Sequence, residues 1–130
     1  MNAYSILRTT AVGGLLALCL VGCSSSTRPE LAPVRGTVTL DGQPLFPGRI
    51  VFIPAAGRAS SARIDESGQF ELVYLRDVKG AALGEHEVRI TNGSGDPPVN
   101  TLPARYNTQT TLSAHVEPGE NTFDFELTRD

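Results

Sequence analysis

The chain has 130 residues, with 14 acidic and 11 basic side chains and a formal net charge of -3 at pH 7. This length fits one domain, because domains usually contain about 100–150 residues. A nucleic-acid-binding protein would carry clustered Lys and Arg, and this slightly acidic chain has no such cluster, so we expect no nucleic-acid partner. Hydrophobic residues make up 40% of the chain, which predicts a folded domain and not a disordered one.

The first 22 residues have the pattern of a secretory signal. Arg8 is the only charged side chain before an apolar run over residues 11–22. The 12 residues of this run are too few for a membrane-spanning helix, which needs about 20, but they match the core of a signal peptide. The run ends in Leu20-Val21-Gly22 followed by Cys23, and these four residues resemble the lipobox of bacterial lipoproteins.

The lipobox resemblance implies a role for Cys23. In lipoproteins the peptide before this cysteine is removed, the sulfur is diacylated and the new amino terminus is acylated, with palmitate as a typical chain. Residues 1–22 are then a lipoprotein signal peptide, and the lipid on Cys23 attaches the protein to a membrane, since two or more chains anchor stably. Ser24 resembles the residue that follows the cysteine in outer-membrane lipoproteins, so we expect the periplasmic face of the outer membrane in the cell envelope. The alternative is an ordinary secretory signal with Cys23 near the cleavage site.

The mature chain is expected to lack a reactive thiol. Cys19 leaves with the signal peptide and Cys23 carries the lipid, so no thiol remains for a disulfide, a metal site or a nucleophile. Residues 23–33 are rich in Ser and Pro and show no apolar alternation, which is typical of a flexible tether. The folded domain then covers residues 34–130.

Seven short segments of this domain show the signals of strands. Apolar and polar residues alternate in most of them, which predicts strands with one buried face. The segments are 34–40, 49–53, 62–64, 69–74, 85–90, 112–116 and 123–127. Turn residues separate them, at Asp41-Gly42, Asp65-Glu66-Ser67-Gly68 and Glu117-Pro118-Gly119-Glu120.

These signals predict an all-β, seven-stranded sandwich of two sheets, because no stretch sustains helical periodicity. Segments 62–64 and 69–74 are expected to pair as a hairpin. In the last segment, Phe123, Phe125 and Leu127 are expected to face the core.

Three groups of residues carry a family resemblance. They are Gly36-Thr37-Val38-Thr39-Leu40-Asp41-Gly42-Gln43-Pro44-Leu45, Asp65-Glu66-Ser67-Gly68-Gln69-Phe70 and Gly84-Glu85-His86-Glu87-Val88-Arg89-Ile90. Together they are similar to the carboxypeptidase regulatory-like domain, and the chain looks like small lipoproteins of the planctomycete type. The resemblance implies a transthyretin-like Greek-key sandwich. His86 stands where this family commonly has Tyr or Phe.

Few side chains suggest metal binding. The only two histidines, His86 and His115, fall on opposite phases of their strands, whereas a zinc site needs three or four converging ligands. We therefore expect no metal site, and we interpret His86 as a buried residue with a hydrogen bond at the edge of the core. The oxygens of residues 65–68 lack the spacing of a calcium loop and are predicted to form a turn, with Gly68 at positive φ.

No catalytic residues are predicted. No serine lies in a Gly-x-Ser-x-Gly motif. The Tyr-Arg-Gly-Ser tail of the transthyretin-like hydroxyisourate hydrolases is also missing, because the sequence ends in Leu127-Thr128-Arg129-Asp130. We expect a protein without enzyme activity or cofactor. The alternative is a hydrolase or metal-dependent enzyme with an unrecognised site.

The connection over residues 91–109 is the best candidate for a binding site. Loops above about 12–15 residues in compact domains are usually functional or disordered. Arg105, Tyr106 and Asn107 offer a guanidinium, a ring and an amide, groups that recognise sugars or peptides. In the alternative interpretation, Leu102 and Tyr106 fold back over an open end of the sandwich. The first half of the loop, residues 93–100, is expected to be mobile.

The sequence thus predicts a lipid-anchored envelope module with a non-catalytic binding or structural accessory role. Its partners are the membrane, through the lipid on Cys23, and an envelope protein or glycan. A carbohydrate-binding module that uses the loop 93–109 is a further alternative. The oligomeric state stays open.

Overall fold

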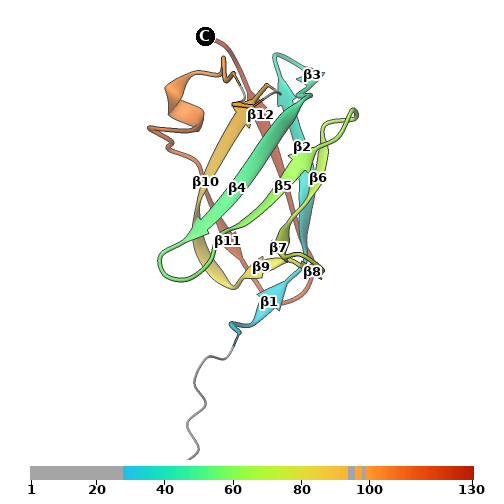
Figure 1. Cartoon of the computed structure of the whole chain (residues 1–130), viewed down its shortest axis with the longest axis vertical. Coiled ribbons are helices and arrows are strands. Elements are labelled where there is room, and N and C mark those ends of the chain that lie inside the picture. Colours follow the sequence, from blue (N-terminus) through green and yellow to red (C-terminus); the bar gives the residue numbers. More distant parts are fainter. Residues whose placement is uncertain (1–27, 94–95, 98) are drawn as a thin grey trace, which may run out of the picture.

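The computed structural model describes residues 28–93, 96–97 and 99–130, and over these residues the chain is all-β (Figure 1). This part of the chain contains no α-helix, only the short 3₁₀ helix η1 (Ala104–Tyr106). None of its helices is long and apolar enough to cross a membrane. The predicted signal peptide and Cys23 lie outside the described residues, as do positions 94, 95 and 98 of the half-loop that we expected to be mobile.

Two large sheets and one short ribbon make up the fold. One sheet has six strands in the order β11-β10-β4-β5-β7-β8, and the other has the order β12-β2-β3 with β6 also paired to β2. The ribbon joins β1 and β9. The strands are β1 (Leu31–Ala32), β2 (Val34–Leu40), β3 (Gln43–Pro44), β4 (Gly48–Pro54), β5 (Ser60–Ile64), β6 (Gln69–Glu71), β7 (Val73–Leu75), β8 (Val78–Lys79), β9 (Ala81–Ala82), β10 (Gly84–Asn92), β11 (Ser113–Val116) and β12 (Asn121–Leu127). Each of the seven predicted segments overlaps one or two of them.

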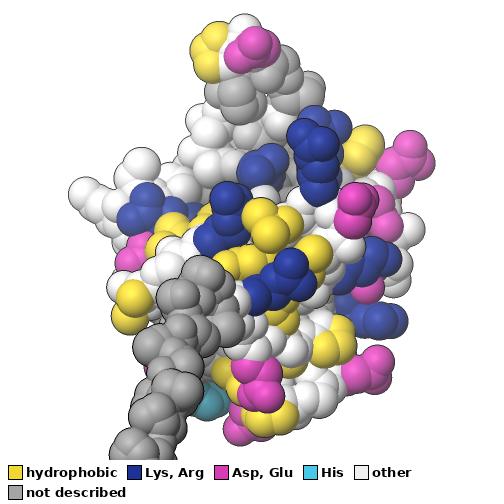
Figure 2. Space-filling model, turned by 60° about the horizontal axis from the view of Figure 1, so that its bottom comes forward, with side chains coloured by type: hydrophobic (Ala, Val, Ile, Leu, Met, Phe, Trp, Pro, Cys, Tyr) yellow, Lys and Arg dark blue, Asp and Glu magenta, His cyan; other side chains and the backbone are white. Residues whose placement is uncertain are grey.

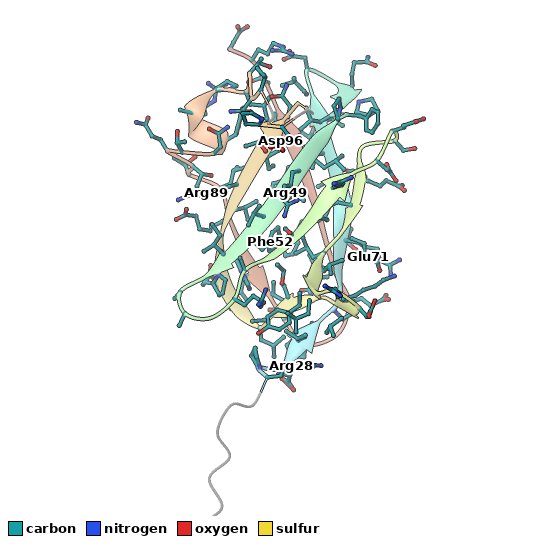
Figure 3. All side chains as sticks on the ribbon, viewed as in Figure 1. Arg28, Arg49, Phe52, Glu71, Arg89 and Asp96 are labelled. Carbon is teal, nitrogen blue, oxygen red and sulfur yellow. The ribbon has the colours of Figure 1, made fainter. Side chains whose placement is uncertain are left out.

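The two large sheets lie one behind the other in Figure 1 and bury their facing sides. Phe52 of β4, labelled in Figure 3, is fully buried between them. Its ring centroid lies 5.6 Å from that of His86 in its own sheet, and 5.7 Å and 6.4 Å from those of Phe123 and Phe125 in the other sheet. Within a largely aliphatic core, an aromatic cluster therefore joins the two layers.

The predicted turns at Asp41-Gly42 and Asp65–Gly68 are confirmed. Asp41 and Gly42 both have positive φ, 53° and 84°, as in the two-residue turns that favour Asp-Gly. The Asp65 carboxylate accepts the N–H groups of Ser67 and Gln69, each at 2.9 Å, and Gly68 has a φ of 81°. The Asp65 side chain is thus bonded to main-chain groups of its own turn, as expected of a turn residue.

The hairpin predicted between segments 62–64 and 69–74 is formed only in part. Asp65 donates its N–H to the carbonyl of Gln69, which closes the turn, but β6 then pairs with β2 in the other sheet. Only β7 returns to β5, where Val73 lies opposite Ser61. The change of sheet occurs at Leu72, which is fully buried and donates its N–H to Val34 at 2.9 Å. The alternation over residues 69–72 does not indicate which sheet each residue joins, so the sequence alone does not show the crossing.

Strand pairing begins within the predicted tether. Leu31 and Ala32 lie opposite Ala82 and Ala81, and Ala32 is only 3% exposed. A strand of two residues is too short to show a period, and this one is followed directly by Pro33. The ordered chain therefore starts before Val34.

Strand β12 runs parallel to β2 over seven residue pairs, from Asn121 opposite Val34 to Leu127 opposite Leu40. The predicted phase is confirmed, because Leu127 is buried and Phe123 and Phe125 pack against the core. Both Phe rings are only partly buried, however, since β12 is paired on one side alone.

Gly36 in the middle of β2 lets the main chain of β12 come close. It lies opposite Phe123 of β12 on one side and Phe70 of β6 on the other. A Cβ atom at this position would overlap the carbonyl oxygen of Phe123. Any side chain here would therefore push the main chain of β12 away from β2.

We predict that Gly36→Ala destabilises the domain by about 1–3 kcal/mol, the usual cost of overpacking a filled core. Thr122→Ala, at an exposed position of the paired strand, should change stability by less than about 0.5 kcal/mol. Urea denaturation of both variants measures the difference. Equal midpoints would mean that β12 is not held tightly against Gly36.

Candidate functional site

One end of the sandwich gathers the long loop, the turn before β4 and the last residues. Figure 3 shows Asp96 at this end and Arg28, where the described chain begins, at the other. We call this region the loop end and define it as residues 41–47, 92–93, 96–97, 99–107 and 128–130. The candidate binding residues of the sequence analysis all lie in it.

Tyr106 covers the core at the loop end. Its side chain is buried, with 8% exposure, and Leu102 earlier in the same loop is 5% exposed. The Tyr106 hydroxyl donates to the carbonyl of Thr128 at 3.1 Å and accepts the Thr128 N–H at 2.9 Å. The interpretation that Leu102 and Tyr106 fold back over an open end is thus confirmed.

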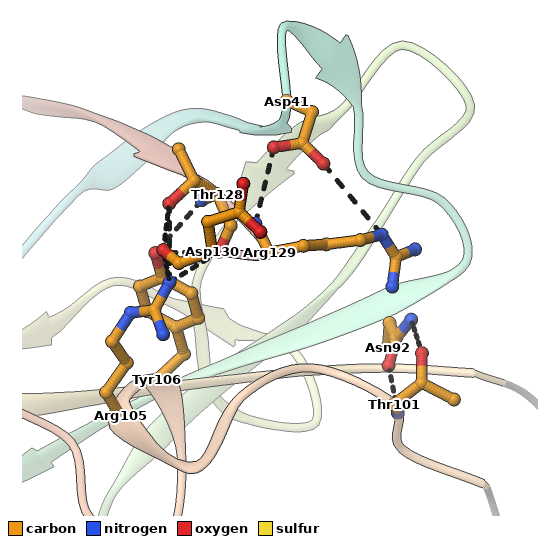
Figure 4. A network of polar contacts seen from close by, with 8 residues as sticks. All are labelled: Asp41, Asn92, Thr101, Arg105, Tyr106, Thr128, Arg129 and Asp130. Carbon is orange, nitrogen blue, oxygen red and sulfur yellow. Dashed lines mark hydrogen bonds and ion pairs between the residues drawn. The ribbon is translucent and has the colours of Figure 1, made fainter.

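Arg105 reinforces the same contact (Figure 4). Its guanidinium donates to the carbonyls of Thr128 at 2.8 Å and Asp130 at 2.6 Å, and lies 4.7 Å from the centre of the Tyr106 ring. Burial acts to raise the pKa of Tyr106, but the hydrogen bonds to Thr128 and the nearby Arg105 charge outweigh it and lower that pKa below its ordinary value. Arg105, Tyr106 and Thr128 form what we call the Thr128 cluster.

Asn107 is buried beside this cluster, with 5% exposure. Its side-chain amide donates to the carbonyls of Ile90 at 3.1 Å and Pro103 at 3.2 Å, and its oxygen accepts the N–H of Thr108. The structure thus brings the three predicted binding residues together and gives each a partner in its own chain. Their binding of a ligand stays a prediction.

Both ends of the half-loop at residues 93–100 are fixed by side chains. Asn92 donates to the hydroxyl of Thr101 at 2.9 Å and accepts the Thr101 N–H at 2.7 Å. The Asn100 side chain accepts the N–H groups of Asn92 and Leu102, each at 3.2 Å. Nearby, Arg129 pairs with Asp41 at 3.9 Å. The base of the loop is therefore well defined (Figure 4).

Two exposed apolar side chains stand out at the loop end. Phe46 is 53% exposed and Val99 is 68% exposed, and no other large hydrophobic residue of the described ranges is exposed. They lie on neighbouring loops, because the Gly93 N–H donates to the Pro47 carbonyl at 3.1 Å and a Cβ atom at Gly93 would overlap the carbonyl oxygen of Val99. Sequence reasoning missed Phe46, since it lies in a turn segment where no alternation marks a residue as inward or outward.

The histidines occupy structural positions. His86 is 2% exposed, and its Nε2 lies 2.7 Å from the carbonyl oxygen of Ala82, which confirms the predicted hydrogen bond. His115 is exposed and lies 2.8 Å from Glu85. Within the described ranges, no three His, Cys, Asp or Glu side chains come together in a group that could hold a metal ion.

Exposed arginines lie on the six-stranded sheet, and Figure 2 shows basic and hydrophobic side chains next to one another on the part of the surface that it displays. Arg49 lies opposite Arg63, and Arg89 lies opposite Val51. A hollow of about 460 Å³ on β4, β10 and β11 includes Glu85 and Glu87. His115 pairs with Glu85 and Arg89 pairs with Glu87, each at 2.8 Å.

Comparison with known proteins finds no match to any protein-family model, to any curated protein or to any solved structure. The function is therefore inferred from the residues themselves.

We predict that Tyr106→Ala destabilises the domain by about 2–4 kcal/mol, because it removes a buried ring and the partner of Thr128. Tyr106→Phe keeps the ring and should cost about 1 kcal/mol, the usual contribution of a hydrogen bond. Thermal and urea denaturation provide the measurement. A Tyr106→Ala domain as stable as the wild type would show that the ring is a solvent-facing binding residue.

Proposed function

We propose that this protein is a lipid-anchored module of the bacterial cell envelope that binds a partner protein through its loop end and performs no catalysis. The observation that carries this proposal is the exposure of Phe46 and Val99 on neighbouring loops. Single exposed hydrophobic residues are common on soluble proteins, but adjacent ones surrounded by charged groups are typical of interaction sites.

A lipid anchor on Cys23 would place the loop end away from the membrane, where a partner can reach it. Four residues lie between Cys23 and Arg28, so the five Cα–Cα steps from one to the other span at most about 18 Å. Arg28 lies at the far end of the molecule from Asp96 (Figure 3). A lipid on Cys23 would therefore keep the Arg28 end close to the membrane and direct Phe46 and Val99 away from it. On the periplasmic face of an outer membrane, that direction is into the periplasm.

The chemistry of the loop end favours a protein over a glycan. Sugar binding needs an exposed aromatic face with free hydrogen-bonding groups beside it. Tyr106 is buried, and Arg105 and Asn107 donate to main-chain oxygens. Phe46 and Val99 instead offer exposed apolar side chains, while Asp41 and Arg129 of the loop end pair with each other.

We also propose that the domain is a seven-stranded Greek-key sandwich of the carboxypeptidase regulatory-like type. Support comes from the motif residues, since Asp41-Gly42 and Asp65–Gly68 form the turns that this family's pattern requires. His86 packs its ring against Phe52, as the aromatic residue common at that position would.

We predict that Cys23→Ala releases the protein from the membrane fraction and abolishes labelling by radioactive fatty acid. Cys19→Ala is the matched control, since that residue would be removed with the signal peptide, and it should behave as the wild type. Membrane fractionation and labelling in cells provide the test. Equal labelling of the Cys23→Ala protein would contradict the anchor without bearing on the loop end.

We predict that a photo-crosslinking side chain at Phe46 captures a specific envelope protein in intact cells. The same side chain at Ala56, in the exposed loop between β4 and β5 at the opposite end, is the control and should capture none. Adding Val99→Ser should reduce the Phe46 adduct at least about tenfold, the loss expected for about 1.4 kcal/mol of apolar contact. Identical adducts from both positions would contradict a binding role for the loop end.

A further inference from the structure

The edge of β12 has unpaired backbone groups. In a strand, successive residues direct their N–H and C=O groups to opposite sides. Asn121 donates its N–H to Pro33 at 3.0 Å and Leu127 accepts the Asp41 N–H at 2.9 Å, and both partners adjoin β2. The odd-numbered residues of β12 therefore face β2. The even-numbered residues direct their N–H and C=O groups to the opposite side, where no strand of the described chain pairs with β12. These residues are Thr122, Asp124 and Glu126.

This edge lacks most of the features with which proteins usually protect an edge strand, and its two carboxylates, Asp124 and Glu126, are the exception. Edge strands are commonly short, bulged, charged, interrupted by proline or covered by another element. β12 pairs with β2 over seven consecutive residues without a shift in register and contains no proline. The Thr128 cluster covers the chain only beyond Leu127. Residues 122–126 thus form a regular stretch that can accept another strand.

The side chains on the two faces of β12 define what such a strand would carry. On the outer face Asp124 and Glu126 are exposed, and β12 has no Lys or Arg. On the inner face the Phe123 and Phe125 rings stack with centroids 6.3 Å apart and are partly exposed. An added strand would place alternate side chains beside carboxylates and beside aromatic rings, so basic and apolar residues in alternation fit best.

We infer that the open edge of β12 binds an extended peptide segment with alternating basic and apolar residues, which adds to the sheet as a new strand. Main-chain hydrogen bonds to Thr122, Asp124 and Glu126 hold the segment, as in other cases of strand addition. A second copy of this chain fits less well, because pairing of two β12 strands brings carboxylates together. This surface is separate from Phe46 and Val99.

The test uses the detergent-solubilised full chain and a synthetic peptide of alternating lysine and valine. Amide hydrogen exchange followed by NMR should show Thr122, Asp124 and Glu126 exchanging fast in the free protein. Saturating peptide should slow them at least about tenfold. The amides of Phe123 and Phe125, bonded to β2, should be protected in both states. No change at the three even-numbered amides would overturn the inference.

Variants separate strand addition from general charge attraction. Thr122→Pro removes one edge donor without touching the β2 ladder and should weaken peptide binding at least about tenfold, whereas Thr122→Ala should bind as the wild type. If Thr122→Pro does not fold, Glu126→Pro serves the same purpose. Asp124→Lys with Glu126→Lys should transfer the preference to a peptide of alternating glutamate and valine. Wild-type binding by a folded proline variant would overturn the inference.

Two controls distinguish this inference from the alternatives. Phe46→Ser with Val99→Ser should bind the peptide normally, so failure of the proposed loop-end function leaves this test unaffected. Protection of Thr122, Asp124 and Glu126 that rises with protein concentration in the absence of peptide would assign the edge to a second copy and overturn the peptide assignment.

Discussion

The fold depends on the contact of Phe52 with rings from both sheets. Phe52 is fully buried, and its neighbours His86, Phe123 and Phe125 come from two different strands, β10 and β12. Truncating a buried Phe of this kind to Ala costs about 3–5 kcal/mol, a large part of the stability of a small domain. Gly36 permits the cluster by letting the main chain of β12 approach β2 closely. The position of β12, and with it the open edge of the sheet, follows from this packing.

Alternation along the chain predicted the inward and outward faces well. His86, Val88 and Ile90 are all buried in β10, in the phase that the sequence indicates. The period of two is a property of one strand, and it contains no information about the strand's neighbours. The crossing at Leu72 and the parallel pairing of β2 with β12 were therefore not visible in the sequence. They are decided by contacts between residues far apart in the chain.

At the candidate site, too, the properties of single residues could be predicted, and contacts between residues far apart in the chain could not. The chemistry of Arg105, Tyr106 and Asn107 was readable from their side chains, but their partners were not. Tyr106 and Thr128 are 22 positions apart, and no local pattern links them. Phe46 was not identified from the sequence, because its exposure depends on how the turn before β4 leaves the sheet. Turn residues such as Asp65, whose partners are Ser67 and Gln69, were predictable because all their contacts are local.

The two ends of β12 are held by side chains, while its middle has a free edge. The Asn121 amide donates to Glu117 at 2.8 Å and Gly119 at 3.1 Å, and it also reaches Pro33, which fixes the start of the strand. Tyr106 fixes the residue that follows its end. A strand ordered in this way loses little conformational entropy when another strand pairs with it, so more of the hydrogen-bond energy contributes to affinity. The Tyr106 contact thus has a second consequence, since the residue that closes the core also keeps the β12 edge straight and accessible.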